Sequence, residues 1–248
     1  MKHSVFFSLI IALFLTGCDK NEMEISFKNL QELMQHYNYN EADEVIACAG
    51  NNRDSDSVNI FFYPEAEAKD FRYFEAPLGI NENDYINYKQ HSTDPKLLLN
   101  RYLKAFKRDG ATEAWGIVTF MLNGKLHASN PIRLKQLHKK TEYNNSLLTI
   151  DFLDPTSPKF TWGDGQLMEN EIFYEIVMDK NKEVLSATYT YDREYKYYDV
   201  LNVVLNLTNP SPPKEITTGE EYIIAVMGVS IDNWINLFIE KPFIVPSN

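Results

Sequence analysis

The chain has 248 residues, with 24 Lys and Arg against 35 Asp and Glu, and a formal net charge of −11 at pH 7. Because phosphate backbones bind proteins through Lys and Arg, such an acidic chain is excluded as a nucleic-acid-binding protein. The length exceeds the usual single-domain size of about 100–150 residues, so two domains are expected. Abundant Tyr and Phe, 15 of each, with only 10 Gly, favour strands over glycine-rich phosphate loops.

The first eighteen residues have the layout of an export signal. Lys2 precedes an apolar run over residues 5–15, which ends in small residues before a cysteine. The run is too short for a hydrocarbon core, which needs about 20 apolar residues. Leu15-Thr16-Gly17-Cys18 resembles the bacterial lipobox. The resemblance implies that residues 1–17 are a signal peptide and that Cys18 is acylated. An ordinary secretory signal that contains a cysteine is the alternative.

Acylation of Cys18 implies a location at the outer membrane or cell surface of a Gram-negative bacterium, with the periplasmic face left open. Without residues 1–17 the chain keeps 23 Lys and Arg against 35 Asp and Glu, a net charge of −12. It lacks a basic cluster for anionic head groups, so membrane lipid is expected to be contacted through Cys18. Cys48 lies in the apolar run 45–49 and is predicted to be a buried, unreactive thiol.

The first half is expected to be mostly strands. Residues 18–40 are polar and acidic and predict a tether, although Leu30, Leu33, Met34 and Tyr37 have the spacing of a short helix. Strands are predicted at 45–49, 58–63 and 71–74. Asp94 as N-cap, Pro95 at the first helical position and Gly110 beyond the end then predict a helix over 94–108.

A hairpin follows this predicted helix. Residues 115–120 lead into Asn123-Gly124, the strongest short-range hairpin signal, and the return strand 125–134 is interrupted by Pro131. A polar segment follows, and it separates a first domain, residues 41–137, from a second domain, residues 138–248.

The second half of the chain is also predicted to consist mostly of short strands. They are predicted at 147–152, 159–162, 172–178, 184–191, 200–207, 221–229 and 236–244. Strands at this spacing, separated by turn signals, favour an all-β sandwich.

Residues 216–226, Ile-Thr-Thr-Gly-Glu-Glu-Tyr-Ile-Ile-Ala-Val, resemble the E–F corner of a fibronectin type III domain. The resemblance implies that the ring of Tyr222 fills the corner of the core, that its hydroxyl bonds the backbone upstream, and that Trp162 is the core tryptophan. Residues 117–120 with Ser129-Asn130-Pro131 resemble the last two strands of the same family more loosely. The expected fold is all-β, with two tandem immunoglobulin/fibronectin type III-like β-sandwiches, the first with an inserted helix.

The motifs of common catalytic sites are missing from the sequence. No His or Cys pair has metal-ligand spacing, and there is no Gly-x-Ser-x-Gly elbow or phosphate loop. We therefore predict no catalytic residue, no metal and no cofactor. Carboxylates are plentiful, so a hydrolase that uses a carboxylate pair stays as a second alternative.

Two aromatic features are candidate ligand sites. Asp232, Asn233 and Trp234 lie in the loop between the last two strands, where a Trp can stack on a sugar or anchor an interface; alternatively, Trp234 closes the sandwich end. Tyr195 and Tyr197 follow a strand with alternating tyrosines and form either an exposed platform or a core ladder.

These features predict a lipid-anchored cell-envelope binding protein without catalytic activity, with a glycan as the possible ligand. The alternative is a structural or adhesive lipoprotein that contacts an envelope protein. Exposure discriminates the two, because a flat row of exposed rings favours sugar, whereas a contiguous apolar patch rimmed by charge favours protein.

Overall fold

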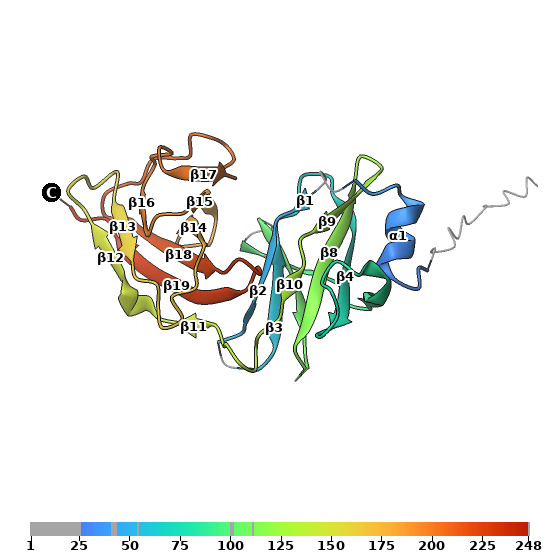
Figure 1. Cartoon of the computed structure of the whole chain (residues 1–248). Coiled ribbons are helices and arrows are strands. Elements are labelled where there is room, and N and C mark those ends of the chain that lie inside the picture. Colours follow the sequence, from blue (N-terminus) through green and yellow to red (C-terminus); the bar gives the residue numbers. More distant parts are fainter. Residues whose placement is uncertain (1–25, 41–43, 54, 100–101, 111, 248) are drawn as a thin grey trace, which may run out of the picture.

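The computed structural model of the protein describes residues 26–40, 44–53, 55–99, 102–110 and 112–247. Figure 1 shows two β-sandwiches side by side, with helix α1 (Leu30–His36) at one end of the molecule and the C-terminal residues at the other. Within the described part of the chain the architecture is β throughout, apart from α1 and short 3-10 turns such as η1 (Tyr85–Asn87) and η3 (Asn145–Leu147).

The first sandwich consists of two facing sheets. The larger sheet has the order β1 (Glu44–Val45), β9 (Lys125–Ser129), β8 (Ala114–Leu122), β4 (Lys69–Pro77), β5 (Lys89–His91), and β10 (Ile132–Arg133) also pairs with β8. The other sheet has the order β2 (Ala47–Asn51), β3 (Val58–Phe62), β7 (Leu103–Arg108), β6 (Lys96–Leu98). Inward side chains such as Ile60, Phe62, Val118 and Phe120 fill the space between the sheets.

The second sandwich follows the same plan. Its larger sheet has the order β11 (Glu142–Tyr143), β19 (Ile235–Ile244), β18 (Glu221–Val229), β14 (Ile172–Asp179), β15 (Val184–Thr190), β17 (Val203–Asn206). The smaller sheet has the order β12 (Leu148–Asp151), β13 (Lys159–Trp162), β16 (Glu194–Lys196).

Both sandwiches have the strand order of immunoglobulin-like folds, in which strands A, B and E form one sheet and C, F and G the other. In each, the first strand is divided between the sheets. β1 and β11 pair in parallel with the last strands β9 and β19, and the next segments, β2 and β12, pair antiparallel in the opposite sheet. The predicted all-β sandwich fold is confirmed.

The E–F corner of the second sandwich has the predicted geometry. The backbone N–H of Thr217 donates to the hydroxyl of Tyr222 at 2.9 Å. Gly219 has φ +81°, a conformation that glycine adopts without strain. Tyr222 and Trp162 are both buried in the same core cluster, which confirms the two roles that the family resemblance implied.

The helix predicted over residues 94–108 is wrong, because this segment forms β6 and β7. Phe106 on β7 points into the core, where it stacks on Phe62 at 5.4 Å and on Tyr73 at 5.7 Å between ring centroids. Two residues further, the guanidinium of Arg108 donates from Nε to Glu75 on the facing sheet at 2.7 Å. These contacts outweigh the local helical signals.

The predicted short helix at Leu30 exists, but it is not part of a tether. Asn29 caps α1 by accepting the N–H of Glu32 at 2.9 Å. Leu30 and Leu33 are fully buried against Phe74 and Ile117, so α1 covers the outer face of β4 and β8. The tether predicted for residues 18–40 is therefore wrong from Phe27 to Tyr37, which pack against the sandwich.

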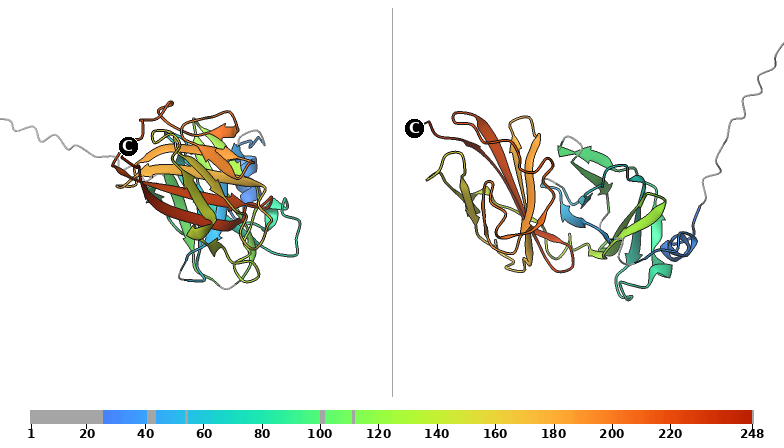
Figure 2. Two further views of the ribbon diagram at one scale, coloured as in Figure 1. Left: turned by 90° about the vertical axis from the view of Figure 1, so that its left-hand side faces the viewer. Right: turned by 90° about the horizontal axis from the view of Figure 1, so that it is seen from above.

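The two sandwiches pack against each other through sheet faces. One mixed cluster holds outward side chains of the first sandwich and of β14, β15 and β18 of the second, among them Cys48, Phe61, Leu103, Tyr174, Tyr189 and Met227. The hydroxyl of Tyr102 donates across the contact to the carbonyl of Leu207 at 2.6 Å. The molecule is thus a stack of α1 and four sheets, which Figure 2 shows from the end and from above.

Cys48 lies in this contact between the sandwiches. Burial raises the pKa of its thiol to about 12. Because the thiolate is the reactive form, this direction favours the neutral thiol of the half-buried Cys48, in line with the structural role that its apolar neighbours predicted.

Candidate functional site

The loop that carries Trp234 enters the first sandwich. Trp234 is fully buried among first-sandwich core residues such as Val58 and Leu134. Its indole N–H donates to the carbonyl of Lys139 at 2.8 Å, and the N–H of Ala49 on β2 donates to the carbonyl of Asn233 at 3.0 Å. A ring buried in this way has no face for a ligand.

The neighbours of Trp234 hold the same contact. The carboxylate of Asp232 pairs with the Nζ of Lys135 at 2.8 Å, and the amide of Asn233 donates to the carbonyl of Pro131 at 3.1 Å. The prediction that the ring of Trp234 binds a ligand is therefore wrong, because it is buried where the two sandwiches meet. The ligand role of Asp232 and Asn233, which are half-buried, stays a prediction. Local sequence carries no signal for a partner that lies about a hundred residues away along the chain.

The tyrosine platform is also absent. Tyr195 and Tyr197 are buried in the second core, where Tyr197 donates its hydroxyl to the carbonyl of Lys214. Tyr189 stacks on Tyr174 in the contact between the sandwiches, with ring centroids 4.4 Å apart. The ligand role predicted for Tyr195 and Tyr197 is wrong, and the core alternative is confirmed.

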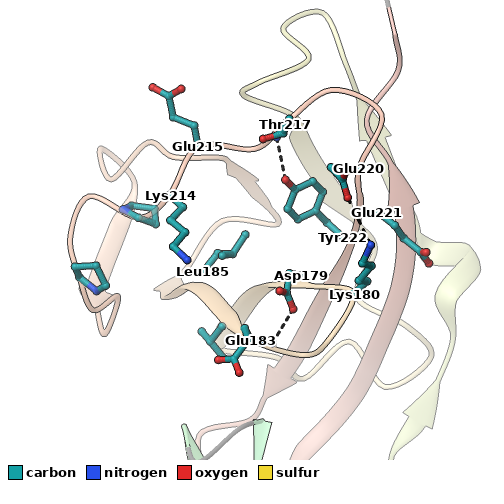
Figure 3. Close-up of a pocket in the computed structure, with 13 residues that line it drawn as sticks. Asp179, Lys180, Glu183, Leu185, Lys214, Glu215, Thr217, Glu220, Glu221 and Tyr222 are labelled. Carbon is teal, nitrogen blue, oxygen red and sulfur yellow. Dashed lines mark hydrogen bonds and ion pairs between the residues drawn. The ribbon is translucent and has the colours of Figure 1, made fainter.

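A hollow of about 470 Å³ lies at the corner of the second sandwich, between the β14–β15 hairpin, the loop 210–217 and the start of β18. Figure 3 shows its lining, with Lys214 pointing inward and Glu215 pointing away. Lys180 pairs with Glu220 at 3.7 Å. Tyr222 is the one aromatic ring among the described residues that line this hollow, and its hydroxyl is occupied by Thr217. The hollow therefore lacks a stacking surface for a sugar.

A wider hollow, about 780 Å³, lies beside Asp232 at the junction of the sandwiches. Its charges are largely neutralised by one another: Lys139 pairs with Glu169, and the Nδ1 of His138 lies 2.8 Å from Glu113. Burial opposes ionisation of Glu113, but hydrogen bonds from the ring and backbone of His138 outweigh it and lower its pKa. A hydrogen bond from Lys139 likewise lowers the pKa of Glu169, so neither group is suited to act as an acid.

One carboxyl has a pKa held well above its ordinary value. Glu175 on β14 is fully buried, and the cost of placing its charge in the core raises its pKa. The hydroxyl of Thr190 lies 2.9 Å from one oxygen of Glu175 and 2.7 Å from the carbonyl of Asp192, to which it donates. Glu175 lines neither hollow, so its proton has no route to a bound ligand there.

Two further kinds of site are missing among the described residues. No group of three or more His, Cys, Asp or Glu side chains is arranged to hold a metal ion. No helix in the described part of the chain has the length and apolar character that a bilayer crossing requires.

The edge of the second sandwich carries exposed apolar side chains, which we call the β17 patch: Val200, Leu201, Val204 and Leu205. Leu201 is 93% exposed, and Val204 and Leu205 on β17 are 46% and 40% exposed. Charged residues precede the patch on the chain at Glu194, Lys196 and Asp199. The sequence predicted a strand at 200–207, but not that it is the last strand of its sheet. The exposure of β17 follows from its place at the edge of the sheet, and local sequence does not determine the order of strands in a sheet.

Comparisons with known proteins identify no close relative. No protein family matches the sequence, and no curated protein does. Among solved structures, the FN1–FN3 domains of chicken CNTN1 match 83% of this chain and 67% of their own, at 11% identity and a TM-score of 0.30. Tp47, the 47-kilodalton lipoprotein of Treponema pallidum, matches 82% of this chain at 12% identity and a TM-score of 0.31, and this chain spans about half of its length, 51%. At such low identities and TM-scores, the fold assignment depends on the strand order described above, and the proposal of function depends on the exposed residues of this chain.

Proposed function

We propose that this protein is a lipid-anchored cell-envelope protein without catalytic activity that binds another protein chain through the β17 patch. The observation that carries the proposal is the contrast in exposure: the candidate rings Trp234, Tyr195 and Tyr197 are buried, whereas Leu201 and its neighbours are exposed. Exposed apolar side chains gathered on one edge segment are typical of protein contacts. This favours the structural or adhesive alternative over glycan capture.

Two observations support the absence of catalysis. The carboxyl with a strongly raised pKa, Glu175, is enclosed in a core, and the Glu113 and Glu169 carboxyls at the wider hollow have lowered pKa values. Paired acid and base roles need carboxyls with separated pKa values in one accessible site. Glu175 lines neither hollow, and the two shifted carboxyls at the wider hollow, Glu113 and Glu169, are shifted in the same direction.

The β17 patch is tested by a charge substitution with a matched control. Leu201→Lys places a charge in the patch, and Leu153→Lys places the same charge at another site on the second sandwich that is 95% exposed. Both substitutions leave the cores untouched. The partner is first identified by cross-linking in envelopes, and its affinity for each variant is then measured. We expect the affinity to fall roughly tenfold or more with Leu201→Lys, as for a residue at the centre of an interface. Leu153→Lys should leave the affinity unchanged. Equal binding by both variants, or binding of an arrayed glycan that Leu201→Lys leaves intact, would contradict the proposal.

The anchor is tested at Cys18, which lies outside the described residues. Cys18→Ser keeps the export signal but removes the thiol that a lipid can modify. Without acyl chains, a domain pair of charge −12 without a basic patch has nothing to hold it to an anionic bilayer. We expect the variant to leave the membrane fraction on washing, or to remain as an uncleaved precursor.

Cys48→Ser is the matched control for this experiment, because Cys48 lies between the sandwiches, and it should stay with membranes. If mature-length Cys18→Ser protein still sediments with membranes at high salt, the lipid anchor is wrong.

A further inference from the structure

The open edge of β17 is a strand-pairing site. On one side β17 pairs with β15, and the N–H of Leu207 donates to the carbonyl of Ala187 at 2.9 Å. Because N–H groups alternate in direction along a strand, the backbone N–H and C=O of Asn206 point to the other side. That side has no further strand in the sheet that the described residues form.

This edge is short, but it lacks the charged residues and the proline that commonly prevent strand pairing. Edge strands are commonly protected by Lys, by Pro within the strand or by inward charges. β17 has the sequence Val-Val-Leu-Asn, and the run from Val200 to Pro213 contains no charged residue, in a chain of which 24% is charged. The Pro-free part of this run, Val200 to Asn209, is uncharged and has the composition that favours pairing with identical segments.

We infer that the occupant of the β17 edge is β17 of a second copy of this chain, paired antiparallel about a two-fold axis. The inference rests on the proposed function and names its partner. Two mature copies of charge −12 repel each other, so close approach is favoured where each surface is uncharged. Antiparallel pairing centred on Val204 sets the uncharged run against itself and brings Asp199 opposite Asn209. A two-fold contact is also the commonest form of self-association.

The pair is weak in dilute solution. A strand of four residues covers far less than the roughly 800 Å² per partner of a stable interface. Confinement of both copies to one membrane raises their effective concentration and offsets this weakness. The contact is therefore one that forms on the envelope and dissociates on dilution.

Cross-linking of the full chain tests the inference. Leu205→Cys places a thiol one residue from the proposed axis at Val204, and Ile231→Cys places one at a site that is 85% exposed near the other sandwich. The unmodified chain measures any background from Cys18 and Cys48. With a short bis-maleimide on intact envelopes, we expect Leu205→Cys to give roughly tenfold more covalent dimer than Ile231→Cys, as effective concentration at a paired site predicts.

A second substitution separates strand pairing from chance collision. Val204→Lys, added to Leu205→Cys, brings two like charges together at the axis and should abolish the dimer, whereas Leu153→Lys added to the same background should not. Equal dimer with Ile231→Cys, or dimer that survives Val204→Lys, overturns the inference. If no dimer forms but Leu201→Lys still abolishes binding of a different protein, the second copy is excluded and the proposed function stands.

Discussion

Replacing Trp234 with alanine should lower the free energy of unfolding by about 3–5 kcal/mol, the usual range for loss of a buried Trp or Phe side chain. The indole fills the core of the first sandwich although it belongs to the second, and its N–H is bonded to Lys139. The change therefore leaves a cavity in the core of the first sandwich, and it leaves the carbonyl of Lys139 without its hydrogen bond where the two sandwiches meet. Calorimetry and urea unfolding measure the loss.

The same variant should also change the form of the transition. Because the contact between the two sandwiches is weakened, their unfolding is less tightly coupled, and a single cooperative unfolding transition is expected to divide into two. Trp234→Phe is the control, because it keeps most of the apolar volume and removes the hydrogen bond, which costs about 1 kcal/mol. If the free energy of unfolding falls by less than about 1 kcal/mol in the alanine variant and a single transition remains, the loop does not hold the two sandwiches together.

Glu175→Gln should make the second sandwich more stable at alkaline pH and remove part of its pH dependence. Burial raises the pKa of Glu175 above its value in the unfolded chain, so the folded state binds a proton that the unfolded state has released. Stability is then complete below the unfolded pKa and declines as the pH rises toward the folded pKa. The slope reaches about 1.4 kcal/mol per pH unit for one proton. Glutamine is neutral at every pH and similar in shape.

Unfolding by urea between pH 5 and pH 9, in steps, measures this slope for the wild-type chain and the variant. Glu221→Gln is the matched control, since Glu221 is exposed at the start of β18, and it should reproduce the wild-type slope. A Glu175→Gln protein with the wild-type slope would mean that the buried carboxyl is ionised in the folded state.

Local sequence predicted most of the strands, but it failed at β7, where apolar residues on both faces combine with helix-like capping signals. In β3, inward and outward residues differ enough in burial to give a period of two. In β7, Phe106 faces the core while Leu103 faces the second sandwich. Apolar residues on both sides of a strand remove the alternation and leave spacings that fit a helix.

The candidate site residues were harder to predict than the strands, because many of their contacts join distant segments of the chain. Tyr222 was predicted correctly because its hydroxyl bonds Thr217, five residues away, so the motif contains its own partner. Trp234 has polar neighbours that suggest exposure, yet its partners are Ala49 and Lys139 of distant segments. The β17 patch was missed for a related reason, because a strand is an edge only by virtue of the sheet around it.

The parallel pairing of the first and last strands in each sandwich determines how the molecule carries tension. β1 runs parallel to β9, and β11 runs parallel to β19. A pull on the N-terminal side of β1 against the C-terminal side of β9 slides the two strands along each other, so their hydrogen bonds are loaded together and not one after another. If the proposed lipid anchor holds the chain at its N-terminus, a pull through the second sandwich therefore loads such a shear contact close to the anchor.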